Sequence, residues 1–138
     1  MQHFFEFVVN HWILVSIMAA LVVALMIDGN LKAGPKVSYH EATALINREN
    51  ALILDIRDKN DFKTGYIVDA LNIPNSQLAD QISALGNDKE RPIIVVCKTG
   101  QTASIAAKLL KDKQFTRVYR LAGGMLEWKQ NNLPVVTK

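Results

Sequence analysis

The N-terminal stretch of the chain is mostly apolar, whereas the rest alternates between short apolar runs and segments of mixed polarity. Residues 7–27 contain no Lys, Arg, Asp or Glu, and residues 12–27 are apolar apart from Ser16. At a rise of about 1.5 Å per residue, roughly twenty helical residues cover the hydrocarbon core of a bilayer. The pattern predicts a single transmembrane helix, with residues 1–28 as an N-terminal anchor.

A cleaved signal peptide is the alternative interpretation of this stretch. Residues 1–7 carry no Lys or Arg, and no small-residue cleavage site follows the apolar run, so the anchor is favoured. Residues 29–36 then form a predicted linker that contains Gly34 and Pro35. Because every Lys and Arg lies at or after Lys32, the positive-inside rule predicts an inner (plasma) membrane protein with one span and its C-terminal domain in the cytoplasm.

Residues 37–138 alternate between strand-like and helix-like patterns. Residues 93–96 form a continuous β-branched run, as expected of a strand buried on both faces of a parallel sheet. Further strands are predicted at residues 51–56, 70–74 and 117–121, and helices at 38–49, 75–86, 103–110 and from 124 onward. Ser38 and Glu41 form a capping box at the first of these helices. The alternation predicts an α/β domain around a mostly parallel sheet of about five strands.

The single cysteine of the chain, Cys97, lies where the strand at residues 93–96 ends. A short polar loop around Gly100 follows, and a helix is predicted from Ala103 onward. In a parallel sheet this edge carries the sites, and a helix N-terminus there presents amide N–H groups and a positive dipole end. The adjacent Lys98 adds positive charge, so a reactive thiolate is favoured over the alternative of an inert, buried core cysteine.

Composition and charge exclude several classes of function. With 16 basic and 13 acidic residues and no basic run, the chain is not expected to bind nucleic acid. A single cysteine rules out an internal disulfide and cannot make a cysteine-rich zinc site. His3, His11 and His40 have no second histidine or cysteine nearby, so no metal is expected. A working thiol also fits a reducing compartment.

Two further features leave alternatives open. Asp55 and Arg57 follow a predicted strand, where they could act as an acid–base pair or brace the loops as an ion pair, and the brace is the commoner role. Gly123 and Gly124 precede the last predicted helix, where they could cradle an anion or form a tight turn.

An ordered set of short motifs resembles the rhodanese, or sulfurtransferase, family across roughly residues 37–136. The matching pieces, in the family's order, are Leu54-Asp55-Ile56-Arg57, Asp61-Phe62, Gly65-Tyr66-Ile67, Ala70-Leu71-Asn72-Ile73-Pro74, Val96-Cys97-Lys98-Thr99-Gly100, and Leu121-Ala122-Gly123-Gly124-Met125 followed by Trp128 and Pro134-Val135. The resemblance implies a rhodanese-like three-layer domain that needs no metal or organic cofactor. With its apolar N-terminal segment, the chain is similar to single-pass bacterial membrane proteins that carry this domain.

The resemblance also implies roles for particular residues. Cys97 would be the nucleophile that carries sulfur as a persulfide. The loop that cradles the substrate anion would consist of Lys98, Thr99, Gly100, Gln101, Thr102 and Ala103. Asp55 and Arg57 would brace the site, and Gly123 and Gly124 would shape a neighbouring wall.

The activity that the resemblance implies is transfer of sulfane sulfur from a small donor such as thiosulfate, through the persulfide, to an external thiol acceptor. Thr102 stands where many family members carry Arg, and Ala103 where they carry Ser, so a bidentate oxyanion binder is missing. Ala103 also departs from the Cys-x5-Arg pattern of phosphatases. The alternative is a weakly active or inactive rhodanese-fold interaction module, tethered to the lipid bilayer so that it meets a membrane-protein partner.

Overall fold

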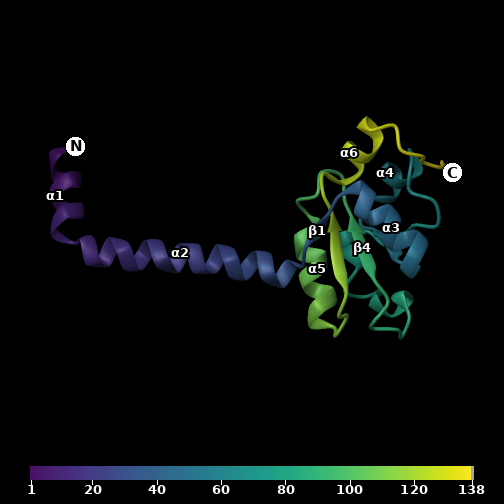
Figure 1. The fold of residues 1–138 in the computed structure, drawn as a ribbon, viewed down its shortest axis with the longest axis horizontal. Coiled ribbons are helices and arrows are strands. Elements are labelled where there is room, and N and C mark those ends of the chain that lie inside the picture. Colours follow the sequence, from purple (N-terminus) through teal and green to yellow (C-terminus); the bar gives the residue numbers. More distant parts are fainter. Residues whose placement is uncertain (138) are drawn as a thin grey trace. The chain divides into compact units, whose positions relative to one another are not determined.

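The computed structural model describes residues 1–137, with the side chains of residues 28–33 outside that description. The chain divides into two compact units, Met1–Leu31 and Lys32–Lys138. Figure 1 shows the helices of the first unit and the sheet domain of the second.

Two helices, α1 (Gln2–Asn10) and α2 (Trp12–Ala33), begin the chain. The backbone of His11 between them has φ −122° and ψ 32°, which is outside the helical range. The prediction of one uninterrupted helix is therefore wrong. The break falls at Asn10 and His11, two consecutive residues of weak helix propensity. α2 continues to Ala33, so the first part of the predicted linker is helical.

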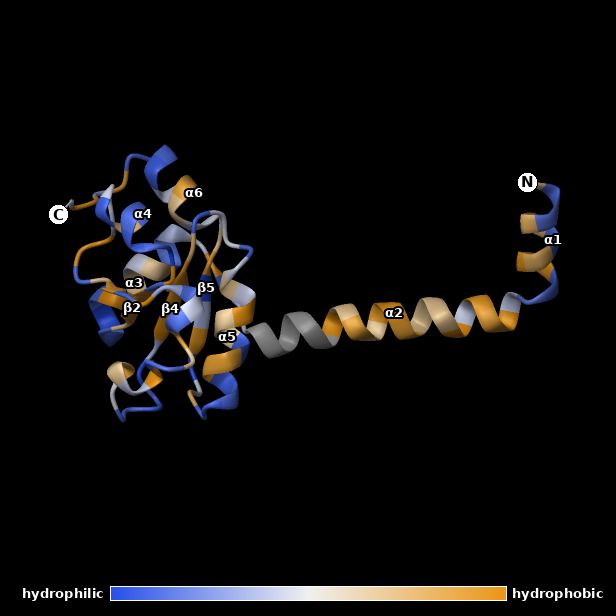
Figure 2. Ribbon diagram, turned by 180° about the vertical axis from the view of Figure 1, so that it is seen from behind, coloured by the Kyte–Doolittle hydropathy of each residue, from blue (hydrophilic) through white to orange (hydrophobic). Residues whose placement is uncertain are grey.

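The apolar residues of this part are concentrated on α2, where residues 12–27 are mostly coloured as hydrophobic in Figure 2. Within the described residues, no single helix is both long enough and apolar enough to cross a bilayer. α1 and residues 12–27 meet that criterion only together, by length and composition, as a pair bent by 85°.

The second unit is built on one parallel sheet. Its strands are β1 (Lys36–Val37), β2 (Leu52–Asp55), β3 (Leu71–Asn72), β4 (Ile93–Val96) and β5 (Val118–Leu121). They pair in the order β1-β5-β4-β2-β3, and every pair of neighbours runs parallel. The predicted five-stranded parallel sheet is confirmed, and β4 lies at its centre.

Helices cover both faces of this sheet (Figure 1). The buried residues of α5 (Ala103–Asp112) pack on one face, and those of α3 (Tyr39–Glu49) and α6 (Gly124–Gln130) pack on the other. The alternating side chains of β4 explain its uninterrupted apolar run: Ile93 and Val95 join the first core, whereas Ile94 and Val96 join the second. The three-layer α/β architecture is thus confirmed.

One predicted helix start is confirmed, and one predicted helix is not observed. Ser38 Oγ accepts a hydrogen bond from the backbone N–H of Glu41 at 3.2 Å, as expected of an N-cap. The single helix predicted at residues 75–86 is wrong, because this segment forms two 3₁₀ turns, Asn75–Gln77 and Ile82–Leu85. Leu78 and Leu85 are buried at helical spacing without a continuous helix between them.

The domain begins at a strand edge held by a buried arginine. Arg120, on β5, is 7% exposed, and its Nε and Nη2 donate to the carbonyl oxygen of Gly34 at 3.1 and 2.8 Å. Its backbone N–H donates to the carbonyl oxygen of Pro35 at 3.0 Å. These bonds join the segment before β1 directly to the second strand of the sheet.

Candidate active site

The turn between β4 and α5 holds the sulfur of Cys97. The residue follows β4 directly, is 4% exposed, and belongs to the core on the α5 face of the sheet. The backbone N–H of Gly100 donates a hydrogen bond to Cys97 Sγ at 2.9 Å. Gly100 has a φ of +95°, which a side chain would disfavour, and this conformation brings the turn back over the sulfur. This amide is placed to donate to negative charge that develops on the sulfur.

The rest of this turn is polar but uncharged beyond Lys98. Thr99, Gln101 and Thr102 are exposed, and Ala103 is buried as the first residue of α5. Thr102 occupies the N-cap position, yet its side chain makes no capping hydrogen bond. The N-terminal amides of α5 are therefore not capped by that hydroxyl, and the positive end of the helix dipole lies beside the Cys97 turn.

The glycine pair closes the wall beside this turn. Gly123 and Gly124 both have positive φ values, +72° and +57°. A Cβ on Gly124 would overlap the carbonyl oxygen of Cys97 and would lie 2.8 Å from the carbonyl carbon of Lys98. The next two backbone N–H groups, of Met125 and Leu126, donate to the carbonyl oxygens of Cys97 and Lys98 at 2.9 and 3.0 Å. These two amides bind the end of β4, so they are not available to an anion.

Lys98 is exposed and lines a small cavity of about 120 Å³, which we call the Lys98 cavity. Its other lining residues come from the segment after β2 and from α6: Arg57, Asp61, Thr64, Met125, Leu126 and Lys129. Cys97 packs on the α5 face of the sheet, whereas the neighbours of Lys98 include residues of α6. The structure thus brings Lys98 together with residues of α6, and Cys97 is not among the residues that line this cavity.

Asp55 and Arg57 form a buried ion pair behind the turn. Arg57 Nη2 lies 2.7 Å from Asp55 Oδ2, and Nε lies 3.0 Å from Oδ1. Arg57 Nη2 also donates to the carbonyl oxygen of Gly65 at 2.8 Å. With 1% and 7% exposure, the two side chains face the protein rather than solvent. This geometry matches the bracing role.

Sequence reasoning missed three residues that the fold brings to this region. Asn72 Nδ2 donates to the carbonyl oxygens of Asp55 and Arg57, both at 3.0 Å, and so fixes the end of β2. Thr64 and Lys129 line the Lys98 cavity. The sequence could have indicated Asn72, because it is a polar residue at the end of a predicted strand. No sequence signal indicates Lys129, which reaches this region only because α6 packs there.

Fold and turn together define an α/β domain with a cysteine held at the carboxyl end of its central parallel strand. The sequence matches the family profile described as rhodanese-like domain over residues 38–131. The chain belongs to the rhodanese-like domain family.

Two relatives and one solved structure place the chain more closely. It is 34% identical over 140 residues to the uncharacterized protein YibN of Escherichia coli (strain K12), covering 99% of this chain and 98% of YibN. It is 32% identical over 102 residues to the thiosulfate sulfurtransferase GlpE of Actinobacillus pleuropneumoniae serotype 3, covering 74% of this chain and 93% of GlpE. The solution structure of the polysulfide-sulfur transferase homodimer from Wolinella succinogenes is similar, with a TM-score of 0.68 and 25% identity over 87% of this chain and 90% of that one. Sulfur transfer is thus the activity named for relatives of this family.

Proposed function

We propose that the protein is a membrane-anchored sulfurtransferase that carries sulfane sulfur as a persulfide on Cys97. The observation that most directly supports the role of Cys97 is the hydrogen bond of 2.9 Å from the Gly100 N–H to Cys97 Sγ. It lies in the turn just before the N-terminus of α5. Family membership and the named sulfurtransferase relatives support the same reaction class.

The first half-reaction is attack of a thiolate on a sulfane sulfur. The Cys97 thiolate bonds to the outer sulfur of thiosulfate, the S–S bond of the donor breaks, and sulfite leaves with the bonding electron pair. The product is a persulfide anion on Cys97. The Gly100 N–H and the N-terminus of α5 stabilise negative charge on sulfur before and after transfer.

The second half-reaction needs a partner from outside the chain, because Cys97 is the single cysteine. An external thiolate attacks the outer sulfur of the persulfide, and the S–S bond to Cys97 breaks. The acceptor leaves as a persulfide, and the Cys97 thiolate is restored. No metal or organic cofactor takes part in either step.

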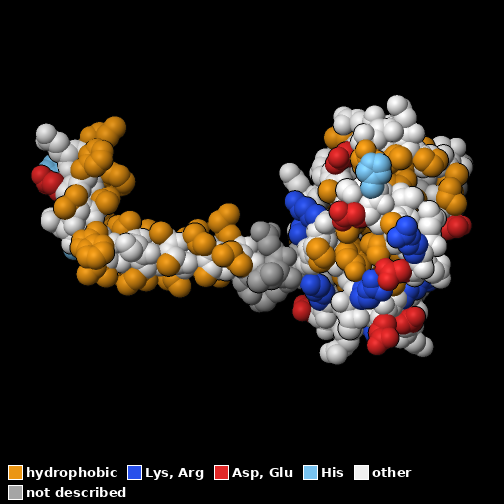
Figure 3. Space-filling view, viewed as in Figure 1, with side chains coloured by type: hydrophobic (Ala, Val, Ile, Leu, Met, Phe, Trp, Pro, Cys, Tyr) orange, Lys and Arg blue, Asp and Glu red, His pale blue; other side chains and the backbone are white. Residues whose placement is uncertain are grey.

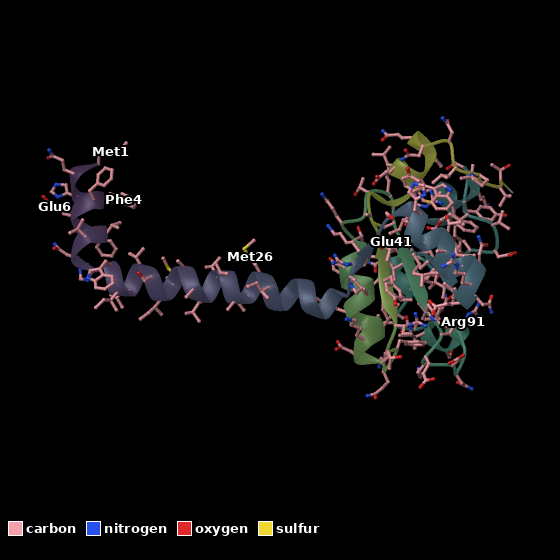
Figure 4. All side chains as sticks on the ribbon, in the orientation of Figure 1. Met1, Phe4, Glu6, Met26, Glu41 and Arg91 are labelled. Carbon is pink, nitrogen blue, oxygen red and sulfur yellow. The ribbon has the colours of Figure 1, made fainter. Side chains whose placement is uncertain are left out.

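The N-terminal helices support anchoring to a lipid bilayer. Trp12 and Leu25 of α2 are 64% and 71% exposed, and Figure 3 shows hydrophobic side chains along both helices. An exposed apolar surface of this extent is typical of membrane contact. α1 is two-sided, with Phe4 and Glu6 on opposite sides in Figure 4, as expected of a helix at the lipid–water boundary. We place the sheet domain in the cytoplasm of a bacterial cell, at the inner membrane, because Lys32 and Lys36 follow the apolar segment.

The decisive experiment measures sulfur on Cys97 in the full-length protein. After incubation with thiosulfate, and separately with inorganic polysulfide, we expect one cyanide-releasable sulfur per chain in the wild type and none in Cys97→Ser. Absence of such sulfur with both donors would contradict the enzymatic function. The topology is tested by labelling Cys97 with a thiol reagent that cannot cross membranes; protection in intact cells and labelling in inverted vesicles are expected.

A second candidate function is an interaction module with little turnover, tethered to the membrane. It is favoured by the uncharged Gln101 and Thr102 in the turn, which give no guanidinium for an oxyanion. The two candidate functions differ in the second half-reaction, in which an acceptor thiol removes the sulfur from Cys97. A persulfide that forms on Cys97 but is not removed by small thiols over many turnovers would support the module.

A further inference from the structure

The sheet ends at β3, which pairs with another strand on one side only. The backbone N–H of Ile73 donates to the carbonyl oxygen of Asp55 at 3.0 Å, toward β2. Successive residues of a strand direct their main-chain groups to opposite sides, so those of Asn72 are directed away from β2. Just before β3, the main-chain groups of Val68 and Asp69 form no hydrogen bond among the described residues. This edge thus offers free main-chain donors and acceptors to another extended segment.

The C-terminal segment of the chain already binds beside this edge in an extended conformation. Val136 and Tyr66 form an isolated antiparallel bridge, in which each backbone N–H donates to the carbonyl oxygen of the other residue, at 2.8 and 2.9 Å. The bridge does not continue to Val68, whose side chain is 51% exposed. An extended segment is therefore accommodated next to the free main-chain groups, and the described C-terminal residues do not cover them.

A cavity of about 710 Å³ lies along this edge, and we call it the β3 groove. It is lined by residues of α4 (Lys59–Lys63), of the segment that leads into β3, of β3 itself and of the C-terminal segment. Its volume is typical of a cleft that receives a ligand. The stacked rings of Phe62 and Tyr66, with centroids 4.0 Å apart, contribute apolar surface together with Val68. The groove can therefore bury apolar side chains of a ligand.

The charges around the β3 groove are mostly positive. Lys59 and Lys63 lie about one turn apart on α4, and both are exposed. Neither ammonium forms an ion pair or a hydrogen bond among the described residues. Asp69 is the only acidic residue in the described lining. Exposed lysines add little affinity each, but they select the charge of the ligand, so this surface favours an acidic one.

We propose that the β3 groove binds an extended acidic segment of a partner protein, which pairs with β3 as an additional strand. The main chain of Asn72 pairs with the segment, Val68 and the ring stack bind its apolar side chains, and the lysines of α4 attract its carboxylates. Because β3 has only two residues, the side-chain contacts supply much of the affinity. The proposal does not depend on sulfur transfer, since no residue of the Cys97 turn lines the β3 groove.

Binding is measured by fluorescence anisotropy with labelled peptides and the full-length protein in detergent micelles, with empty micelles as the blank. The probe is a peptide of alternating Val and Glu of about seven residues, which spans roughly 23 Å when extended. A peptide of alternating Val and Lys tests the charge, and an N-methylated Val–Glu peptide tests the main-chain pairing. We expect saturable binding of the first peptide and about tenfold weaker binding of the other two.

Variants of the lining make the test specific to the β3 groove. The double variant Lys59→Glu and Lys63→Glu should weaken binding of the Val–Glu peptide about tenfold and strengthen binding of the Val–Lys peptide. Val68→Ser should weaken binding of both peptides about threefold to tenfold, because it removes apolar contact. Lys113→Glu is the matched control. It reverses an exposed lysine outside the groove and should leave binding unchanged.

Several outcomes would overturn the proposal. They are equal binding of the acidic, basic and N-methylated peptides, and no saturable binding of any of them. Self-association of the protein that the acidic peptide reverses would assign this edge to a second copy of the chain instead. Cys97→Ser should bind the acidic peptide like the wild type. Peptide binding without sulfur loading on Cys97 would reject the sulfurtransferase and keep the groove, whereas sulfur loading without peptide binding would do the reverse.

Discussion

Two strand-to-helix turns lie side by side at the carboxyl edge of the sheet, and they use the same ingredients differently. In the turn from β4 to α5, the N–H of Gly100 is directed at the sulfur of Cys97. In the turn from β5 to α6, the N–H groups of Met125 and Leu126 bind the carbonyl oxygens of Cys97 and Lys98. The first turn directs a donor at the cysteine that we propose as the nucleophile, and the second uses its donors to fix the first.

The difference shows that a glycine before a helix does not by itself mark a ligand site. Gly100 and Gly124 both have positive φ values, yet a Cβ on Gly100 would meet its nearest atom, Gly123 N, at 3.3 Å, whereas a Cβ on Gly124 would overlap backbone atoms at the end of β4. Gly124 is required by close packing. Gly100 is required by the positive φ of the turn that follows Cys97.

The largest effect is expected from breaking the packed turn. Gly124→Ala should lower the free energy of unfolding by about 3 kcal/mol, because the methyl group collides with the end of β4 and the left-handed backbone is disfavoured. Denaturant unfolding, followed by Trp128 fluorescence in a Trp12→Phe background, measures this. Gly86→Ala is the matched control, since Gly86 has φ +85° and an added methyl group would have no atom within 4 Å. It should cost about 1–2 kcal/mol from backbone strain alone, and equal losses would contradict the close approach at Gly124.

A second substitution tests the turn between β4 and α5. Gly100→Ala should slow sulfur loading on Cys97 about tenfold or more, because the strained turn moves the N–H away from Sγ. Its effect on unfolding should be smaller than that of Gly124→Ala. Loading rates measured with inorganic polysulfide test this, and Gly86→Ala should load at the wild-type rate. An unchanged rate in Gly100→Ala would show that this amide is not needed for transfer.

The smallest effect is expected far from both turns, at the ion pair of Glu49 and Arg117. The hydrogen bond from Arg117 Nη2, 2.7 Å long, holds the pKa of Glu49 below its usual value of 4.5. A carboxyl whose pKa is lowered on folding adds stability above its usual pKa, and this stability is lost as the pH falls through the lowered value. Glu49→Gln should therefore lower the thermal midpoint slightly at neutral pH and not in acid, with sulfur loading unchanged. A change in loading would link the pair to the turns.

Much of the sheet can be predicted from the sequence because its strands are buried on both faces. The run at β4 is uninterrupted for that reason, and Ser38 marks the start of α3 through its own side chain. Residues 75–86 could not be predicted in this way. Burial of Leu78 and Leu85 follows helical spacing, but tertiary packing achieves it with two 3₁₀ turns.

The site was predictable where chemistry is local and not where it depends on packing. Cys97 and its glycine turn follow from a strand, a polar loop and a helix in succession. The neighbours of Lys98 in the Lys98 cavity could not be predicted in this way, because they depend on how α6 packs against the end of β4. The same holds for Lys129, which no motif marks.

The clamp of Arg120 on Gly34 has a mechanical consequence. β1 has only two residues and lies at the edge of the sheet. With its strand pairing alone, it would separate from β5 under a force applied from the N-terminal side. The guanidinium and the backbone N–H of Arg120 bind Gly34 and Pro35 just before that strand, and Arg120 belongs to β5, which pairs with central β4. A force applied at the N-terminal side is therefore transmitted through Arg120 to β5 and to the centre of the sheet. We expect the edge strand β1 to stay paired under such a force.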